Sequence, residues 1–484
     1  MKKIVSIIIF LSIGVTSCAQ VVFNNVYDFN NDLNGSFEIL EVSDGGYLIS
    51  ATYNGNGLTG IWIIKLSYLG DTLWTKQYDI SINGEQAYSL IELSNGGYVV
   101  CGSFSDTITM TASAFLMKID NQGDSLWMKK YETAGHDYAY NVAQTPDGGF
   151  VVAGWIWLAP SLTTTDAWVF KTDSLGNMLW QKQFDEYGFS EFIQGLVVNA
   201  DSTIVIGGTT LLNSTTSRAY VVKLTPNGDV IWKKEFAGPT AADIFNMDTT
   251  SDEGYIVAGN IIINGEQRAY AAKLDSLGNV VWENDFARGD RNYSFSAIHE
   301  LPNGNFMAAG VDIDVNQPIL TGEPRVRLFE LNALGDSIWS KQYTHYGAGS
   351  EDYVFDMKLT NDGGYVMCGY IINGSLPQKN DVLVIKVDSN GCDVSNCTVG
   401  INENTLIENE VIVYPNPNNG TFTIEASNLE NSVLEIYNLT GQLVSQTTLQ
   451  NNTKTIDISK QANGLYLLKI TSNQQVVTRR IVKQ

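Results

Sequence analysis

Asp44-Gly-Gly-Tyr-Leu-Ile-Ser50 is the first copy of a short stretch that recurs along most of the chain. Six further copies, more or less exact, begin at Asn95, Asp147, Asp201, Asp252, Asn303 and Asp362, so that successive copies lie 51–59 residues apart. A turn residue followed by β-branched and aromatic residues predicts a strand. Self-similarity at a nearly fixed period predicts a repeat architecture.

Each of the first six repeats contains four strand-like segments. In one unit they are Ala87–Leu93, a strand from Tyr98, the apolar run Ala114–Lys118 and Leu126–Tyr131. A glycine precedes the fourth segment, and it recurs as Gly70, Gly123, Gly176, Gly228, Gly278, Gly335 and Gly391. Glycine enters positive φ at little cost, as tight hairpins require. Four strands in a period of this length predict an all-β, seven-bladed β-propeller over residues 20–398.

The two ends of the repeat region complement each other. The seventh repeat lacks its fourth strand, because Gly391 is followed by Cys392. Phe23–Asp28 matches Trp74–Asp79 at the aromatic, tyrosine and aspartate positions. We therefore predict that residues 21–29 form the outer strand of the seventh blade. Such pairing closes the ring and removes two exposed strand edges.

Two side chains recur with the repeat. A tryptophan stands at one position in six repeats, as Trp74, Trp127, Trp180, Trp232, Trp282 and Trp339. This pattern loosely resembles the tryptophan docking of quinoprotein-type propellers, and we expect these rings to pack between blades rather than to serve as sugar-stacking platforms. A lysine ends the third strand as Lys65, Lys118, Lys171, Lys223, Lys273 and Lys386, with Glu330 as the exception. We expect each lysine stem to lie along its blade with a paired charged head.

The C-terminal region reads as a separate β-module. Strand-like runs with polar turns between Val411 and Val482 predict a small immunoglobulin-like β-sandwich. This region contains, in order, Tyr414-Pro-Asn-Pro417 with Asn419-Gly420, Ile436-Tyr-Asn-Leu-Thr-Gly441, Gly464-Leu-Tyr466 and the ending Ile481-Val-Lys483. Together these motifs resemble the C-terminal sorting domain of the type IX secretion system. The resemblance implies recognition of residues 411–484 by that machinery and export to the outer cell surface or the medium. Residues 399–410 are then a linker.

The N-terminus agrees with export. Met1-Lys-Lys3, the apolar run Ile4–Val15 and the small residues Ser17 and Ala19 have the form of a signal peptide over residues 1–19. An alternative is a lipoprotein, since Val15–Cys18 fits a lipobox that directs lipidation of Cys18. No later run reaches the roughly 20 apolar residues of a transmembrane helix, so the mature chain is predicted to lack a transmembrane segment.

The amino-acid composition bears on nucleic-acid binding, metal binding and disulfide formation. With 52 acidic and 29 basic side chains, the formal charge is −23, which disfavours nucleic acid as a partner. The three histidines show no metal-ligand spacing, and we expect His299 to be a packing residue. We also expect the protein to bind no cofactor and no metal, and to be a monomer. Cys392 and Cys397 are a candidate disulfide in an oxidising exterior. Cys101 and Cys368 share one repeat position and are expected to be small buried residues.

The first strand of each repeat suggests a site. Alignment on the glycine pair places Phe37, Tyr88, Tyr140, Gln194, Phe245, Ser296 and Phe355 at one position, followed by Glu38, Ser89, Asn141, Gly195, Asn246, Ala297 and Asp356. Strand alternation predicts that the two sets face opposite sides. If the first strands are innermost, the second set lines the central channel, where Glu38 and Asp356 could hold a cation or a ligand amine. The competing explanation is that converging strands simply admit small or polar residues near the axis.

These features lead to two functional hypotheses. The first is a noncatalytic propeller that binds an unidentified glycan or protein through Glu38, Ser89, Asn141, Asn246 and Asp356. The second is a carbohydrate-active enzyme, a hydrolase or lyase that uses carboxylates on one face of the ring. The predicted sorting signal is compatible with both the binding module and the enzyme, so the geometry of the site has to distinguish these two hypotheses.

Overall fold

Strands provide the regular secondary structure in the described part of the chain, which contains no helix. The computed structural model describes residues 20–29, 33–55, 58–79, 84–105, 111–133, 135–157, 164–185, 190–213, 216–236, 241–287, 291–314, 324–346, 349–373, 379–393, 411–416, 418–426, 432–438, 443–448, 453–472 and 475–483. The all-β prediction is confirmed. Two compact units divide the chain, Met1–Cys397 and Thr398–Gln484. The predicted signal peptide, Cys18 and the predicted linker lie outside the described residues.

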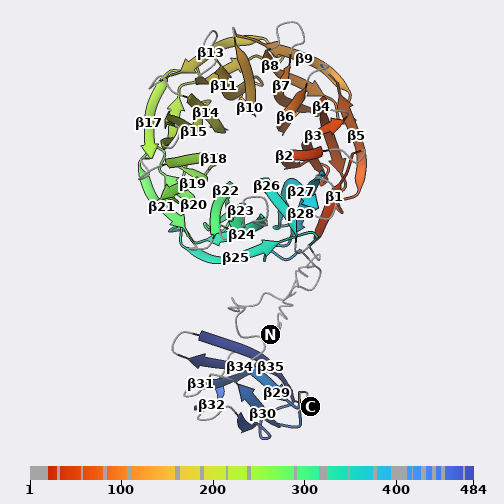
Figure 1. The fold of residues 1–484 in the computed structure, drawn as a ribbon, viewed down its shortest axis with the longest axis vertical. Helices are drawn as coiled ribbons and strands as arrows, with labels where there is room; N and C mark the ends of the chain where they lie inside the picture. Colours follow the sequence, from red (N-terminus) through yellow and green to blue (C-terminus); the bar gives the residue numbers. More distant parts are fainter. Residues whose placement is uncertain are drawn as a thin grey trace, which may run out of the picture. The chain divides into compact units, whose positions relative to one another are not determined.

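The described strands of the first unit form seven antiparallel four-stranded sheets, arranged in a ring (Figure 1). The innermost strands are β2 (Leu33–Glu41), β6 (Glu85–Glu92), β10 (His136–Gln144), β14 (Ser190–Val198), β18 (Ala241–Thr249), β22 (Arg291–Glu300) and β26 (Ser350–Leu359). The second strands are β3 (Tyr47–Gly55), β7 (Tyr98–Ser105), β11 (Phe150–Trp157), β15 (Ile204–Asn213), β19 (Tyr255–Ile263), β23 (Phe306–Asp314) and β27 (Tyr365–Asn373).

The outer half of each sheet follows the same order. The third strands are β4 (Leu58–Leu66), β8 (Ala112–Ile119), β12 (Thr165–Thr172), β16 (Thr216–Leu224), β20 (Glu266–Leu274), β24 (Arg325–Leu331) and β28 (Asn380–Val387). The outermost strands are β5 (Thr72–Tyr78), β9 (Ser125–Tyr131), β13 (Met178–Phe184), β17 (Val230–Phe236), β21 (Val280–Phe286), β25 (Ser337–Tyr343) and β1 (Phe23–Tyr27).

The ring is closed by the N-terminal strand. β1 pairs antiparallel with β28, with Phe23 opposite Lys386 and Tyr27 opposite Val382. The sheet order β1-β28-β27-β26 joins the first and last strands of the unit, and Figure 1 shows red β1 beside cyan β28. The predicted closure is therefore confirmed.

The recurring aromatic residue packs on the turn glycine of the next sheet. Gly176 has φ +77°, and a Cβ built on it would lie 3.1 Å from the Trp127 ring. The same contact joins Trp74 to Gly123, Trp180 to Gly228, Trp232 to Gly278, Trp282 to Gly335 and Trp339 to Gly391. Phe23 takes this place over Gly70, at 3.0 Å. The predicted packing of the tryptophans between sheets is thus confirmed, and the N-terminal strand continues the pattern.

Four of the six repeated lysines form ion pairs with carboxylates, as expected, and Lys223 lies over the Tyr255 ring. The ammonium of Lys65 lies 2.6 Å from Asp44, and that of Lys171 lies 2.7 Å from Asp147. Lys386, whose side chain is fully buried, lies 3.0 Å from Asp362. Each carboxylate belongs to the turn that opens the second strand of the same sheet, so the lysine ties that turn to the third strand.

The C-terminal unit consists of two sheets. One contains β29 (Val411–Tyr414), β30 (Thr421–Ala426) and β33 (Thr453–Asp457), and the other contains β32 (Leu443–Thr448), β31 (Val433–Asn438), β34 (Gly464–Ser472) and β35 (Gln475–Lys483). Phe422 and Ile424 of the first sheet share one core with Leu434 and Leu468 of the second. Such a shared core is what a sandwich of two sheets requires. Since helices are absent from the described residues, no helix there is long and apolar enough to span a membrane.

Candidate functional site

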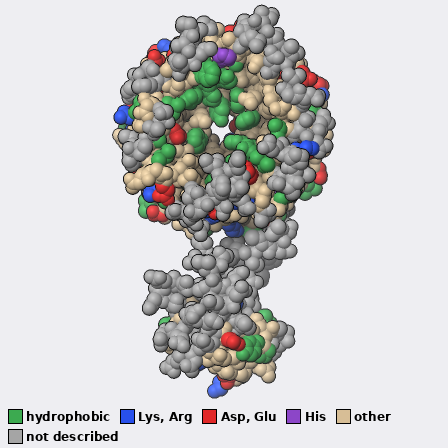
Figure 2. Space-filling view, viewed as in Figure 1, with side chains coloured by type: hydrophobic (Ala, Val, Ile, Leu, Met, Phe, Trp, Pro, Cys, Tyr) green, Lys and Arg blue, Asp and Glu red, His purple; other side chains and the backbone are tan. Residues whose placement is uncertain are grey.

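The seven inner strands enclose a cavity of about 540 Å³ at the centre of the ring. Every inner strand contributes lining residues, and Figure 2 shows the hollow centre with hydrophobic side chains around it. Cavities of this size commonly hold small ligands. The predicted residues Glu38, Ser89, Asn141, Asn246 and Asp356 all line it.

A bulge in each inner strand corrects one prediction. The pairing of β2 with β3 skips one residue between Ser36 and Glu38, and equivalent skips occur in the other six inner strands. The skipped residues are Phe37, Tyr88, Tyr140, Gln194, Phe245, Ser296 and Phe355. Because a bulge places an extra residue on its strand, simple alternation fails there. Both this set and the predicted polar residues therefore line the cavity, and the expectation that the two sets face opposite sides is wrong.

The predicted polar residues also join neighbouring sheets. The Asp356 carboxylate accepts a hydrogen bond from the Ile39 amide at 3.1 Å, and the Glu38 carboxylate accepts one from the Leu90 amide at 2.7 Å. Ser89 and Asn246 accept equivalent bonds from the amides of Val142 and Ile298, at 3.4 and 3.2 Å. Asn141 instead donates to the Gln194 carbonyl at 2.9 Å. Part of their role is therefore to satisfy backbone groups at the bulges.

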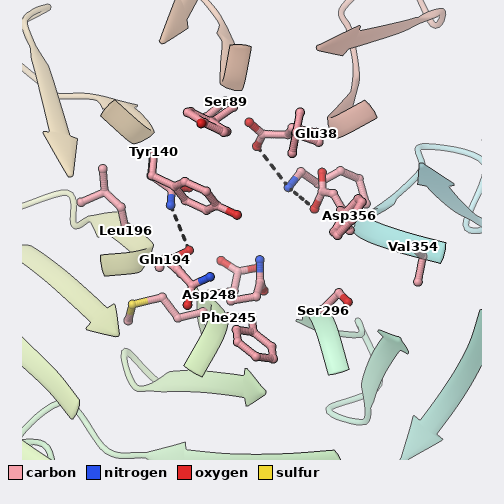
Figure 3. Close-up of a pocket in the computed structure, with 18 of the residues that line it drawn as sticks. Glu38, Ser89, Tyr140, Gln194, Leu196, Phe245, Asp248, Ser296, Val354 and Asp356 are labelled. Carbon is pink, nitrogen blue, oxygen red and sulfur yellow. Dashed lines mark hydrogen bonds and ion pairs between the residues drawn. The ribbon is translucent and has the colours of Figure 1, made fainter. Parts of the chain in front are cut away.

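A lysine of the chain itself lies between Glu38 and Asp356. The Lys358 ammonium is 3.0 Å from Asp356 Oδ1 and 3.5 Å from Glu38 Oε1, and dashed lines mark both contacts in Figure 3. Burial raises the pKa of Glu38, against the opposing effect of Lys358. Burial also disfavours the charge of Lys358, but Asp356 and Glu38 outweigh it and raise the pKa of that ammonium. The cation expected between these carboxylates is thus supplied by the protein.

A second pair of polar side chains, Asp248 and His299, also lines the cavity. His299 Nδ1 is 2.5 Å from Asp248 Oδ2, and His299 Nε2 is 2.7 Å from the Met357 carbonyl oxygen. Both ring nitrogens therefore lie within hydrogen-bonding distance of an oxygen acceptor. Although burial acts to raise it, the pKa of Asp248 is lowered by His299. His299 is partly buried, as expected, but it also lines the cavity.

Asp248 and Lys358 are site residues that sequence reasoning missed. With His299 they occupy the position two residues beyond Asn246, Ala297 and Asp356, on three consecutive inner strands. The other four strands carry Leu40, Ile91, Ala143 and Val197 there. A change from apolar to charged residues at one repeat position is the signal that could have identified them.

An aromatic arc, a chain of ring contacts, runs from β26 round to β14, and five of its rings line the cavity. The centroids of Phe355 and Phe37 are 5.9 Å apart, those of Phe37 and Tyr88 5.3 Å, and those of Tyr88 and Tyr140 5.1 Å. The arc comprises Tyr353, Tyr370, Phe355, Phe37, Tyr88, Tyr140, Tyr138, Trp155 and Phe192. Phe355 is 39% exposed, so the arc presents apolar surface to a ligand.

Cysteines and one carboxylate cluster lie outside the central cavity. Cys392 is buried and disulfide-bonded, and its predicted partner Cys397 lies outside the described residues. Cys101 and Cys368 are buried free thiols, as expected. Carboxylate oxygens of Asp166, Asp185 and Glu191 lie within 4.8 Å of one another and could hold a cation. Since acidic groups often gather without an ion, this cluster alone defines no metal site.

Comparison with known proteins identifies the C-terminal unit. Residues 412–484 match the secretion system C-terminal sorting domain, which confirms the predicted type IX sorting signal. A chain with this domain is exported to the cell surface or secreted. A search of curated proteins found no match.

Several solved structures resemble the chain distantly. A protein of unknown function from Bacteroides caccae is 15% identical, with a TM-score of 0.37, over 64% of this chain and 94% of that one. PorZ, a surface component of the type IX secretion system of Porphyromonas gingivalis, is 13% identical, with a TM-score of 0.31, over 91% and 69%. The β-propeller domain of the Trilobed protease from Pyrococcus furiosus is 8% identical, with a TM-score of 0.41, over 79% and 99%.

Proposed function

We propose that residues 20–398 form a seven-bladed β-propeller that acts outside the cell as a noncatalytic binding module. The type IX machinery exports the chain by recognising residues 411–484, which fold as an immunoglobulin-like sandwich. The propeller works as a monomer and takes its ligand, a glycan or a protein, at the central cavity. The observation that carries this proposal is that all seven inner strands contribute to one cavity of ligand size.

The contacts of the charged groups support binding rather than catalysis. Glu38 and Asp356 each accept a backbone hydrogen bond from the neighbouring sheet and share the Lys358 ammonium. Asp248 is paired with His299. A general acid or base has to exchange a proton with substrate, whereas these carboxylates are committed to contacts that hold the ring together.

One observation favours the second candidate, a carbohydrate-active enzyme. Burial raises the pKa of Glu38, and this residue lies close to a second carboxyl group, that of Asp356, through their shared lysine. A raised pKa beside a second carboxylate is typical of glycosidases, in which one carboxyl acts as general acid.

A combined binding and turnover experiment separates the two candidates. The purified protein is screened against immobilised glycans and extracellular proteins, and every glycan that binds is then assayed for new reducing ends and unsaturated products. Binding without product is expected. Product formation that is lost in Glu38→Gln would instead establish the enzyme.

A further inference from the structure

We infer that the central cavity binds an uncharged carbohydrate, whose sugar rings stack on the aromatic arc. This inference rests on the proposed binding function and specifies its ligand. Three features of the cavity support this inference. They are the continuous aromatic surface, the excess of carboxylates over basic side chains, and the backbone amides of the inner strands that already donate hydrogen bonds.

The aromatic arc has the chemistry that a sugar ring needs. One face of a pyranose presents C–H groups with a slight positive charge, while the face of an aromatic ring is the negative end of its quadrupole. Phe355, Phe37, Tyr88 and Tyr140 follow one another at 5.1–5.9 Å, on four inner strands. A continuous series of rings around a curved wall can contact several sugar units, or one unit in several orientations.

The charges in the cavity select against ionic ligands. Among the described lining residues, three carboxylates, those of Glu38, Asp248 and Asp356, outnumber the two basic side chains, Lys358 and His299. This balance, with the formal charge of −23 on the whole chain, repels sulfated, uronic or phosphorylated ligands. A ligand amine is also disfavoured, because Lys358 already occupies the place between the two carboxylates. A neutral ligand remains.

Neutral polar groups lie across from part of the arc. Gln194 on β14 and Ser294 and Ser296 on β22 line the same cavity, and Figure 3 shows Gln194 and Ser296 among the residues around it. Amides and hydroxyls both donate and accept hydrogen bonds, as sugar hydroxyls do. Aromatic walls with a few such groups form a typical small-ligand site.

A peptide would fit this cavity less well. Extended peptides bind sheets by adding a strand through backbone hydrogen bonds. The amides of Ile39, Leu90 and Val142, on three inner strands that carry the arc, already donate to side chains of neighbouring sheets. The edges that such a peptide would need are thus partly occupied.

The test is titration calorimetry of the full mature protein with neutral hexasaccharides of glucose, mannose and galactose, and with an oligogalacturonate as the anionic counterpart. Phe355→Ala and Tyr88→Ala remove rings of the arc. Tyr68→Ala is the matched control, since Tyr68 is 56% exposed and lies on a hairpin turn outside the arc. Thermal melting of each variant shows that it remains folded.

We expect at least one neutral hexasaccharide to bind, with affinity reduced about tenfold or more by each arc variant and unchanged by Tyr68→Ala. The inference is overturned if no neutral hexasaccharide binds, if the oligogalacturonate binds as well, or if folded arc variants bind normally. Capture of a peptide by the cavity in place of sugar would overturn the inference and leave the binding function intact. Binding of a neutral sugar followed by its cleavage would support the inferred ligand but overturn the proposed noncatalytic function.

Discussion

Adding one methyl group at Gly176 should destabilise the protein much more than adding it at Gly148. Both glycines have positive φ, +77° and +83°, so alanine incurs a similar backbone penalty of about 1–2 kcal/mol at each. Their surroundings differ. A Cβ at Gly148 would meet nothing within 4 Å, whereas at Gly176 it would lie 2.9 Å from the Lys129 stem and 3.1 Å from the Trp127 ring.

The difference between the two variants isolates the contact between sheets. Overpacking a close contact costs about 1–3 kcal/mol, so Gly176→Ala should lose about 2–5 kcal/mol and Gly148→Ala about 1–2 kcal/mol. Urea unfolding followed by tryptophan fluorescence measures both losses. Equal losses would show that the turn glycine is needed only for its φ and that the neighbouring Trp127 ring does not restrict this position.

Three further predictions follow from the charges and the domain organisation. Lys358→Met should lower the free energy of unfolding by about 3 kcal/mol at neutral pH, because Glu38 and Asp356 lose their shared cation. Burial raises the pKa of Glu38, so protonation of that carboxyl should shrink the loss as pH falls, and a pH-independent loss in urea titrations would contradict this prediction. Hydrogen bonds from Lys171 and Lys273 lower the pKa values of Asp147 and Asp252 to about 2. The stability that these two carboxylates contribute is therefore complete above their ordinary pKa and lost as pH falls toward 2. Over this pH range the melting temperature of Asp147→Asn/Asp252→Asn should decline less than that of the parent protein, and parallel curves would count against these ion pairs. Deletion of residues 404–484 should abolish surface and medium signals in fractionation immunoblots, and normal export without them would exclude the sorting role.

The repeat made the ring predictable. Because strand, turn glycine and aromatic recur at one spacing, the missing strand of the last repeat and the extra strand at Phe23–Tyr27 could be matched by residue type alone. The structure places Phe23 over Gly70 in the way that Trp127 lies over Gly176. Local chemistry and long-range pairing agree here, so sequence reasoning was sufficient.

The cavity was predictable only in part. Its polar positions could be found by alignment, but a bulge is a backbone irregularity that residue types do not reveal, and it brought Phe37 and Tyr88 into the lining. The position of Lys358 between Glu38 and Asp356 depends on the adjacency of the first and last inner strands. The contact between Lys358 and Glu38 joins residues 320 positions apart in sequence, so a search for local motifs could not identify it.

Closure of the ring by the N-terminal strand is the central claim, since the cavity and its lysine exist only if β2 and β26 are neighbours. Cross-linking tests it directly. Asn25 lies opposite Val384, and Val26 lies opposite Leu383. Asn25→Cys/Val384→Cys should therefore form an intrachain disulfide on mild oxidation, whereas Asn25→Cys/Leu383→Cys should not, because a one-residue shift turns the side chain to the opposite face of the sheet. Non-reducing mass spectrometry of proteolytic fragments reads out both; no cross-link in the first pair, or equal cross-linking in both, would contradict the closed ring.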